Sequence, residues 1–409
     1  MFTEPAPMLR SATALVALAL AAPAFADDWA QPVVDLQQSL AAVGIGLGGG
    51  VTGFGQGLAG GDGRYGVPFG GKADVLLGLD GGKLGLWQGF GASAHFEQTF
   101  GQSANEQGAG AILPVDTALA FPTLGGTTTD LSVIVTQKFG EVVSVSLGKF
   151  NMLDVIGRTP LIGGGGETTF WNIGLAAPVS GVTPPYIVGG IATLNTAPAS
   201  FTLMVYDPRN AQDSDVIAHP FAQGTTTSLS AKVQTAFFGL TGYQTFRGVV
   251  STAAGFDFDE APQLLLPSGS AAKLTKQGYL FGSYAVQQFL WADPDNPGKG
   301  WGIFAQISAS DANPNPIGNT VIVGVGGATP GRPDDRWGVA WCDYLWSGRL
   351  RNGLVAFGGG LNDERVLEAY YDAAVAPHIR LGPDAQVVWP GTPAASTALF
   401  LGVRGRVAF

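Results

Sequence analysis

The sequence is short of charged residues. Asp, Glu, Lys and Arg make up 13% of its 409 residues, whereas hydrophobic residues make up 46%. An average soluble domain carries about 25% charged residues. The shortage indicates that much of the surface of this protein faces something other than water.

Features that support disulfides, membrane helices or metal sites are also scarce. Cys342 is the only cysteine, which excludes an intrachain disulfide framework and predicts a small buried side chain. Beyond the N-terminal region, no segment offers the roughly 18 consecutive apolar residues of a transmembrane helix. The three histidines, His95, His219 and His378, lie far apart without the spacing of a zinc site. We therefore predict no metal and no cofactor.

Signals for catalysis and for nucleic-acid binding are weak as well. The formal net charge of −10 argues against nucleic acid as a partner. No G-x-S-x-G sequence marks a nucleophile. A G-x-G-x-x-G match at residues 44–49 is followed by the strand-like residues 51–54, whereas a dinucleotide site needs a helix at that point. We predict that the protein is not an enzyme.

The N-terminus predicts export. Arg10 precedes an apolar run over residues 12–22, and Ala24-Phe25-Ala26 supplies an A-x-A cleavage site. We therefore interpret residues 1–26 as a signal peptide. Residues 27–43 form a short leader whose apolar positions repeat with a helical period, and residues 44–409 form the predicted main domain.

Strict alternation of apolar and polar residues dominates that domain. Near the C-terminus, Leu399, Leu401 and Val403 share one parity, whereas Arg404 and Arg406 share the other. Successive side chains of a β-strand point to opposite faces, so this period predicts strands with one apolar face. The same alternation recurs in residues 131–138, 142–149, 228–235, 301–310, 366–375 and 379–388.

The connections between these strands alternate in length. Short turns at 80–83, 139–141 and 376–378 contrast with long segments at 101–129, 151–185, 207–224, 251–276 and 311–318. Outer-membrane barrels have short periplasmic turns and long extracellular loops, with aromatic residues near the strand ends. The aromatic residues that fit such girdles are Trp301, Trp337, Trp346, Trp389 and Phe409.

These patterns predict an all-β fold, a transmembrane antiparallel β-barrel of about 16 strands. The alternative is a secreted all-β sandwich or solenoid, in which alternation would separate a packed core from water. The apolar faces disfavour the sandwich, because they mix Ala, Gly and Leu and end in Trp or Tyr rather than resembling a core.

Several segments resemble the OprB-type carbohydrate-selective porin family. The stretches at 300–341 and 364–390 contain "GWGIFAQISASDANPNPIGN" and "ERVLEAYYDAAVAPHIRLGPDAQVVWP", and the family-like strands "LGLWQGFGASAHFEQTFG" and "VSVSLGKFNMLDV" lie earlier. The resemblance implies a porin of the bacterial outer membrane that passes small neutral sugars. It also implies contact with membrane lipid and lipopolysaccharide, and assembly by the barrel assembly machinery. A monomer and a homotrimer both remain open.

Sugars are neutral and rich in hydroxyls, so a channel that prefers them needs hydrogen-bond donors and acceptors together. The interior parity near the C-terminus supplies both, with one aromatic ring: Glu368, Tyr370, Asp372, Arg380, Asp384, Arg404 and Arg406. We expect residues 151–170, with Arg158 and Glu167, to fold inward as a constriction. His95 and Glu97 share one strand face and are expected to line the lumen. The alternative is that these residues are wall ion pairs that only tune conductance.

Three functions remain at this point. The first is a sugar-preferring porin, and the second is a general diffusion porin that leans towards cations because the chain is acidic. The third is a barrel without a pore, such as an adhesin, which should show a large surface domain.

Overall fold

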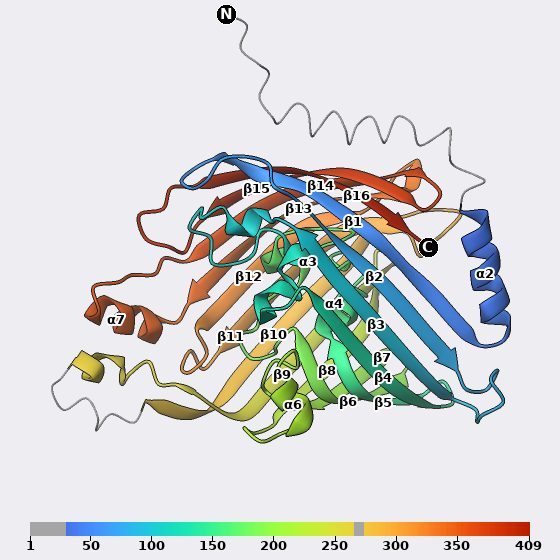
Figure 1. Ribbon diagram of the computed structural model, residues 1–409, viewed down its shortest axis with the longest axis horizontal. Helices are drawn as coiled ribbons and strands as arrows, with labels where there is room; N and C mark the ends of the chain where they lie inside the picture. The colour runs from blue at the N-terminus through green and yellow to red at the C-terminus, as the bar shows by residue number, and fades with distance from the viewer. Residues whose placement is uncertain (1–29, 266–273) are drawn as a thin grey trace, which may run out of the picture.

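The computed structural model describes residues 30–265 and 274–409, so the signal peptide predicted at 1–26 lies outside the described residues. Within them, 16 strands form one closed antiparallel barrel (Figure 1), in which each strand pairs with its neighbours in the chain and β1 pairs with β16. The predicted all-β barrel and its strand number are confirmed.

All strands except β7, which has 8 residues, have the roughly 9 or more residues that a tilted strand needs to cross a hydrocarbon layer. Their bounds are β1 (Ile45–Gly60), β2 (Phe69–Asp80), β3 (Phe90–Gly101), β4 (Thr129–Phe139), β5 (Val143–Asn151), β6 (Tyr186–Thr196), β7 (Ala199–Tyr206), β8 (Thr226–Phe237), β9 (Leu240–Phe256), β10 (Thr275–Ala292), β11 (Gly300–Ser310), β12 (Ile317–Thr329), β13 (Arg332–Trp346), β14 (Glu364–Ala376), β15 (Ile379–Trp389) and β16 (Ala398–Ala408).

The helices are short and belong to the connections or to the N-terminal segment. They are α2 (Gln31–Ala42), α3 (Thr117–Ala120), α4 (Met152–Ile156), α5 (Ile173–Ala176), α6 (Ser214–Ala218) and α7 (Gly348–Ala356), with 3-10 turns η2 (Ala104–Glu106), η3 (Thr123–Gly125) and η4 (Ala261–Leu265). No helix in the described part of the chain is long and apolar enough to cross a membrane. Helix α2 falls within the leader for which the sequence predicts a helical period.

The two ends of the barrel differ. Figure 1 shows α7 at one end, whereas α2 and the C-terminus lie at the opposite end. Long connections at 102–128, 152–185, 207–225, 257–274 and 347–363 share the end with α7. Tight turns at 140–142, 197–198, 238–239, 330–331 and 377–378 share the other. We call these the long-loop end and the short-turn end, and they match the predicted asymmetry.

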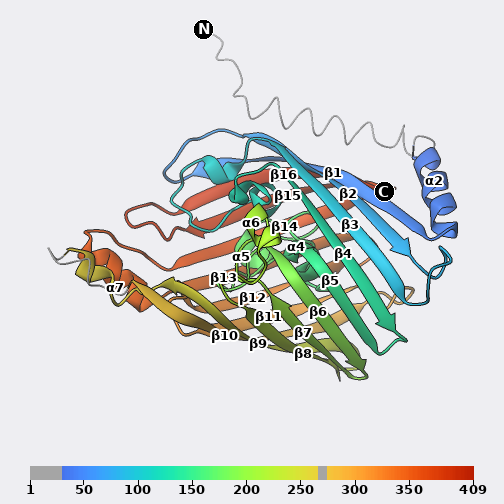
Figure 2. The ribbon, with the colours of Figure 1, turned by 60° about the horizontal axis from the view of Figure 1, so that its bottom comes forward.

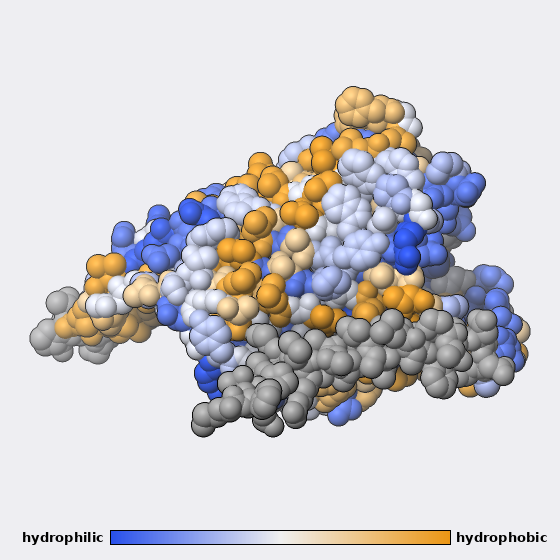
Figure 3. All heavy atoms as spheres, turned by 90° about the horizontal axis from the view of Figure 1, so that it is seen from above, coloured by the Kyte–Doolittle hydropathy of each residue, from blue (hydrophilic) through white to orange (hydrophobic). Residues whose placement is uncertain are grey.

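The outer surface follows the alternation. On β4, Leu131 and Val133 are 51% and 45% exposed, whereas Ser132 between them is 3% exposed. Figure 3 shows orange and pale residues across the middle of the visible face, with stronger blue towards the two ends. Because apolar side chains point outward from almost every strand, the exterior suits contact with hydrocarbon.

The main hydrophobic cluster lies inside the barrel. It joins Phe170 and Leu175 of one connection to Phe304, Ile322 and Tyr344 on the interior faces of β11–β13. Figures 1 and 2 both draw α4, from the same connection, within the ring of strands. The interior is therefore partly filled by chain from its own loops.

One predicted girdle residue is misplaced. Trp346 is only 8% exposed and belongs to the interior cluster. It continues the inward parity of Tyr344 on β13, so its ring points away from lipid. The prediction of an interfacial position for Trp346 is wrong, because an aromatic at a strand end reports an interface only when its parity is outward.

Candidate functional site

The lumen is narrowed by the connection at 152–185, which we call the inward loop. Strand β3 holds both ends of this loop. The Asn151 amide donates to Glu97 at 2.5 Å, and the Tyr186 hydroxyl donates to the same carboxylate. His95 Nδ1 lies 2.8 Å from Asp154 at the start of the loop. The predicted lumen pair His95 and Glu97 therefore positions the loop.

The middle of the inward loop is tied to the wall by a charged contact. Glu167 Oε1 lies 3.2 Å from Lys72 Nζ on β2, and its Oε2 lies 3.5 Å from Arg406 Nε on β16. Lys72 is 2% exposed and also lies 3.4 Å from Asp74. Buried charges need such partners, since their desolvation is otherwise unfavourable. One carboxylate of the loop thus bridges two strands.

Side chains of β14 and β16 satisfy the backbone of the loop. Glu368 accepts the N–H groups of Trp171 and Asn172 at 2.5 and 3.1 Å. Arg404 donates to the carbonyls of Gly166 and Thr169 at 3.0 Å each. Irregular backbone inside a membrane barrel needs such partners, because buried polar groups without hydrogen bonds are costly.

The sequence of the loop permits this close fit through glycine. Residues 163–166 are four consecutive glycines. A Cβ added at Gly163 would lie 2.2 Å from the Thr159 carbonyl oxygen and 2.3 Å from that of Gly157. Only glycine fits at this position, because any side chain would force the backbone apart.

A second connection, 102–128, also packs against the wall. Glu364 accepts the N–H groups of Ile112 and Leu113 at 2.8 Å each, and Gln386 donates to the Val115 carbonyl at 2.9 Å. The sequence analysis expected only one inward connection and missed Glu364. A carboxylate at an inward-facing strand position is the signal that could have drawn attention to it.

Together the two connections cover the lumen faces of β1–β3 and β11–β16, which we call the covered wall. Five predicted path residues lie on it and are at most 5% exposed: Glu368, Tyr370, Asp372, Asp384 and Arg404. Their inward parity matches the sequence, but in this structure they contact loops and each other rather than open space. Alternation predicts whether a side chain points into the barrel or towards lipid. It does not predict whether a loop covers the inward-pointing side chain. Contact between these five residues and a solute stays a prediction.

The other predicted path residues reach water to different degrees. Arg158 is exposed on the inward loop. The side chains of Glu167, Arg380 and Arg406 are 16%, 23% and 26% exposed. Glu167, Arg380 and Arg406 lie at the edge of the covered wall, where a passing solute could meet them.

Three side chains near the root of the inward loop have ligand atoms close enough to hold a metal ion. The atoms of Asp74, His95 and Glu97 all lie within 4.8 Å of one another. However, Lys72 Nζ lies 3.4 Å from Asp74 and 3.9 Å from Glu97, and His95 Nε2 lies 2.9 Å from Asp74. The ammonium group of Lys72 therefore occupies the place beside these carboxylates that a metal ion would take. We interpret the cluster as a network of ion pairs.

The remaining lumen face has a different chemistry. Cross-strand neighbours on β5–β10 form a row of partly exposed polar side chains, which we call the hydroxyl row: Ser144, Thr193, Thr202, Ser230, Arg247 and Ser283. We call the lumen face around this row the open wall. No role was predicted for these residues, although their inward parity and their hydroxyl groups can be recognised in the sequence.

Comparison with known proteins decides the family. The model of the OprB family of carbohydrate-selective porins matches residues 71–409. This chain belongs to that family. It is therefore a porin of the bacterial outer membrane for carbohydrate diffusion, a channel rather than an enzyme, as the sequence analysis predicted. A search among curated protein sequences gives no match.

Solved porin structures share the fold. The high-pH structure of Pseudomonas putida OprB has a TM-score of 0.76 and 18% identity, and the match covers 91% of this chain and 96% of that one. The low-pH structure of the same protein has a TM-score of 0.50 and 16% identity, with 92% and 96% covered. A loop L8 deletion mutant of Vibrio cholerae OmpT has a TM-score of 0.50 and 12% identity, with 89% and 99% covered.

Proposed function

We propose that neutral sugars cross the OprB-family barrel between the inward loop and the open wall. The observation that carries this proposal is the division of the lumen. Loop residues and an apolar cluster fill the space against the covered wall, whereas the hydroxyl row stays partly exposed and meets the inward loop at Arg247, which donates to Thr183.

The chemistry of the row suits a sugar. Each hydroxyl of Ser or Thr can donate one hydrogen bond and accept others, as a sugar hydroxyl does. Thr136 and Ser146 already exchange such a bond at 2.8 Å between β4 and β5, and a sugar could replace one partner with another along the wall. Contacts of this kind are weak, and a conducting channel needs sites that solutes leave readily.

Charged groups border this route. Arg158 on the inward loop and Arg380 at the edge of the covered wall offer donors, and Glu167 offers acceptors. Hydrogen bonds to charged groups are stronger than neutral ones, so these residues would select the orientation of a sugar at the narrowest part. Transport is passive, down a concentration gradient.

The outside of the barrel implies further partners. The apolar outer faces suit membrane lipid, and the long-loop end suits contact with lipopolysaccharide. Insertion by the barrel assembly machinery and assembly as a monomer or homotrimer stay predictions of the sequence.

Current block in planar bilayers tests the proposed function. The purified protein should give stable ion conductance, and glucose should reduce that conductance in a saturable way. Conductance without any sugar block would favour the alternative, a general diffusion porin. The absence of conductance would contradict both and favour a barrel without a pore.

A further inference from the structure

The charges that line the lumen are sorted by sign. The chain has a net charge of −10, which by itself suggests a preference for cations. Inside the barrel, most carboxylates are buried and at most 9% exposed, among them Asp74, Glu97, Glu364, Glu368, Asp372 and Asp384. Carboxylates that reach water more are paired with cations: Asp154 with His95, Glu167 with Lys72 and Arg406, and Asp334 with Lys299.

Several lumen cations, by contrast, reach water without a carboxylate. Lys232 lies over the Tyr243 ring, with Nζ 4.3 Å from the centroid. Arg247 donates to Ser228 and Thr183 hydroxyls at 3.0 and 2.8 Å. In the part of the chain that the structure describes, neither cation has a carboxylate oxygen within 4.0 Å. The water-facing charge of the open wall is therefore positive.

A third lumen cation without a carboxylate partner lies at the short-turn end. Arg336, at the start of β13, donates to the Pro160 carbonyl of the inward loop at 2.8 Å. It also has no carboxylate oxygen within 4.0 Å among the described residues. The inward loop thus holds a guanidinium in place while leaving its charge uncompensated.

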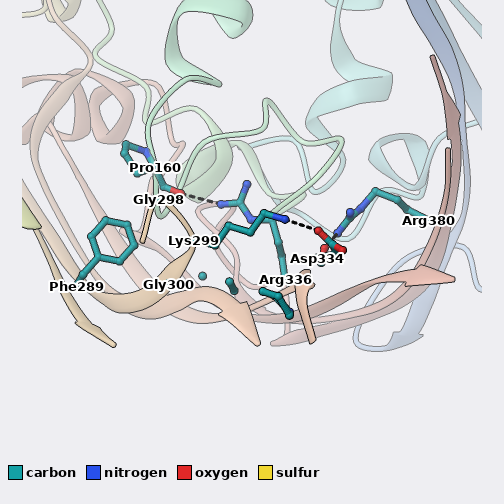
Figure 4. A pocket seen from close by; sticks show the side chains of 11 residues that line it. Pro160, Phe289, Gly298, Lys299, Gly300, Asp334, Arg336 and Arg380 are labelled. Carbon is teal, nitrogen blue, oxygen red and sulfur yellow. Dashed lines mark hydrogen bonds and ion pairs between the residues drawn. The ribbon is translucent and has the colours of Figure 1, made fainter. Parts of the chain in front are cut away.

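Arg336 lines a cavity of about 370 Å³, a size that fits a small ligand. Figure 4 shows Lys299, Asp334 and Arg380 converging beside Arg336, with the Phe289 ring at the other side. The only carboxylate in the lining is that of Asp334, and Lys299 is bound to it. Arg380 is in turn paired with the carboxylate of Asp372. Among the described lining residues, Arg336 is therefore the cation without a carboxylate partner, and its charge leaves the cavity net positive.

We propose that this cavity is an exit site for carboxylated monosaccharides, so that the porin passes sugar acids as well as neutral sugars. A guanidinium binds a carboxylate through two parallel N–H bonds, and Arg336, whose hydrogen-bond partner is the Pro160 carbonyl, supplies such a group. The Phe289 ring offers an apolar face for the sugar ring. This inference rests on the proposed function, because it names a further substrate class for the same channel.

The acidic residues elsewhere do not oppose this. Many of them lie in the connections at the long-loop end, such as Asp207 and Asp259, which pair with Arg209 and Arg349. Salt screens exposed charges beyond about 10 Å at 0.1 M ionic strength. The local charge of the cavity, not the net charge of the chain, therefore decides which ions it prefers.

Glucuronate and glucose form a matched pair of probes, since they differ only in a carboxylate at C6. In planar bilayers, a KCl gradient should give a reversal potential that reports anion preference. Glucuronate added to the short-turn side should reduce the current at a concentration about three- to fivefold lower than glucose, because one local charge contributes that much. A cation preference with no advantage for glucuronate would overturn the inference.

Two substitutions with opposite expected signs sharpen the test. Arg336→Gln should raise the half-blocking concentration of glucuronate about threefold and leave that of glucose unchanged, whereas Asp334→Asn should lower that of glucuronate. Arg349→Gln, on α7 outside the lumen, is the charge-matched control and should change neither. Equal effects of Arg336→Gln on both sugars would also overturn the inference.

These outcomes separate the two proposals. If glucose fails to block an otherwise conducting channel, the proposed sugar route is wrong, whatever the anion preference. If glucose blocks and glucuronate shows no advantage that depends on Arg336, the sugar route stands and the exit site is wrong.

Discussion

The covered wall and the open wall belong to one barrel and obey the same alternation, yet they use polar residues differently. On the covered wall the inward polar residues are mainly charged and buried, as Glu368 and Arg404 are. On the open wall they are mainly hydroxyls that reach water, as Thr202 and Ser230 do. The difference shows that buried charged residues such as Glu368 and Arg404 lie where loop backbone is present to be satisfied.

The physical reason lies in the partners available. A buried carboxylate is tolerated when it accepts hydrogen bonds that would otherwise be missing, and the backbone N–H groups of an irregular loop need acceptors. Glu368 and Glu364 each accept two or more such groups. A hydroxyl facing water needs no fixed partner, so the open wall can stay uncovered.

Removing a loop anchor from the covered wall should give the largest effect. Glu368→Ala leaves the buried N–H groups of Trp171 and Asn172 without an acceptor, at a cost of about 1–3 kcal/mol each. We expect the inward loop to become more mobile and to narrow the lumen less, so that the single-channel conductance rises at least about twofold. The midpoint temperature of unfolding in detergent should fall.

Two variants serve as controls for Glu368→Ala. Glu368→Gln keeps an acceptor and should show a smaller change, and Ser230→Ala on the open wall should leave stability unaltered. A normal conductance and thermal midpoint in Glu368→Ala would show that the loop does not depend on this anchor.

A smaller effect is expected on the open wall. Thr202→Val keeps the shape of the side chain and removes one hydroxyl from the row, and one hydrogen bond contributes about 0.5–1.5 kcal/mol. We expect the glucose concentration for half-maximal block to rise about two- to fivefold, with unchanged ion conductance and folding. Thr202→Ser, which retains the hydroxyl, should behave like the original protein. An identical glucose block in Thr202→Val would exclude the row from the sugar route.

The sequence predicted the barrel well because alternation is a local signal. It assigned the inward parity of Arg404, Arg406 and Glu368 correctly, as the pairing of β14–β16 shows. It predicted strand limits less well near 251–276, where β9 continues to Phe256 and β10 begins at Thr275. Small residues such as Ala253 and Gly255 weaken the alternation there, so the strand ends resembled a loop.

The division into two walls was beyond sequence reasoning for a different reason. It depends on where the connections at 102–128 and 152–185 lie, and contacts such as Leu113 with Glu364 join residues far apart in the chain. No local period encodes such contacts. The predicted path residues were therefore placed on the right face, while the choice between anchoring a loop and meeting a solute required the structure.

The smallest expected effect concerns a single hydroxyl on the covered wall. The Tyr370 ring packs against Phe170 with centroids 4.8 Å apart, is 5% exposed, and its hydroxyl has no hydrogen-bond partner among the described residues. Tyr370→Phe should change neither the glucose block nor the thermal midpoint, because it removes a buried polar group without breaking a bond. Tyr186→Phe is the matched comparison, since the Tyr186 hydroxyl donates to Glu97 and its loss should cost about 1–3 kcal/mol. A weaker glucose block in Tyr370→Phe would mean that a sugar reaches this hydroxyl behind the inward loop, and the boundary between the two walls would then have to move.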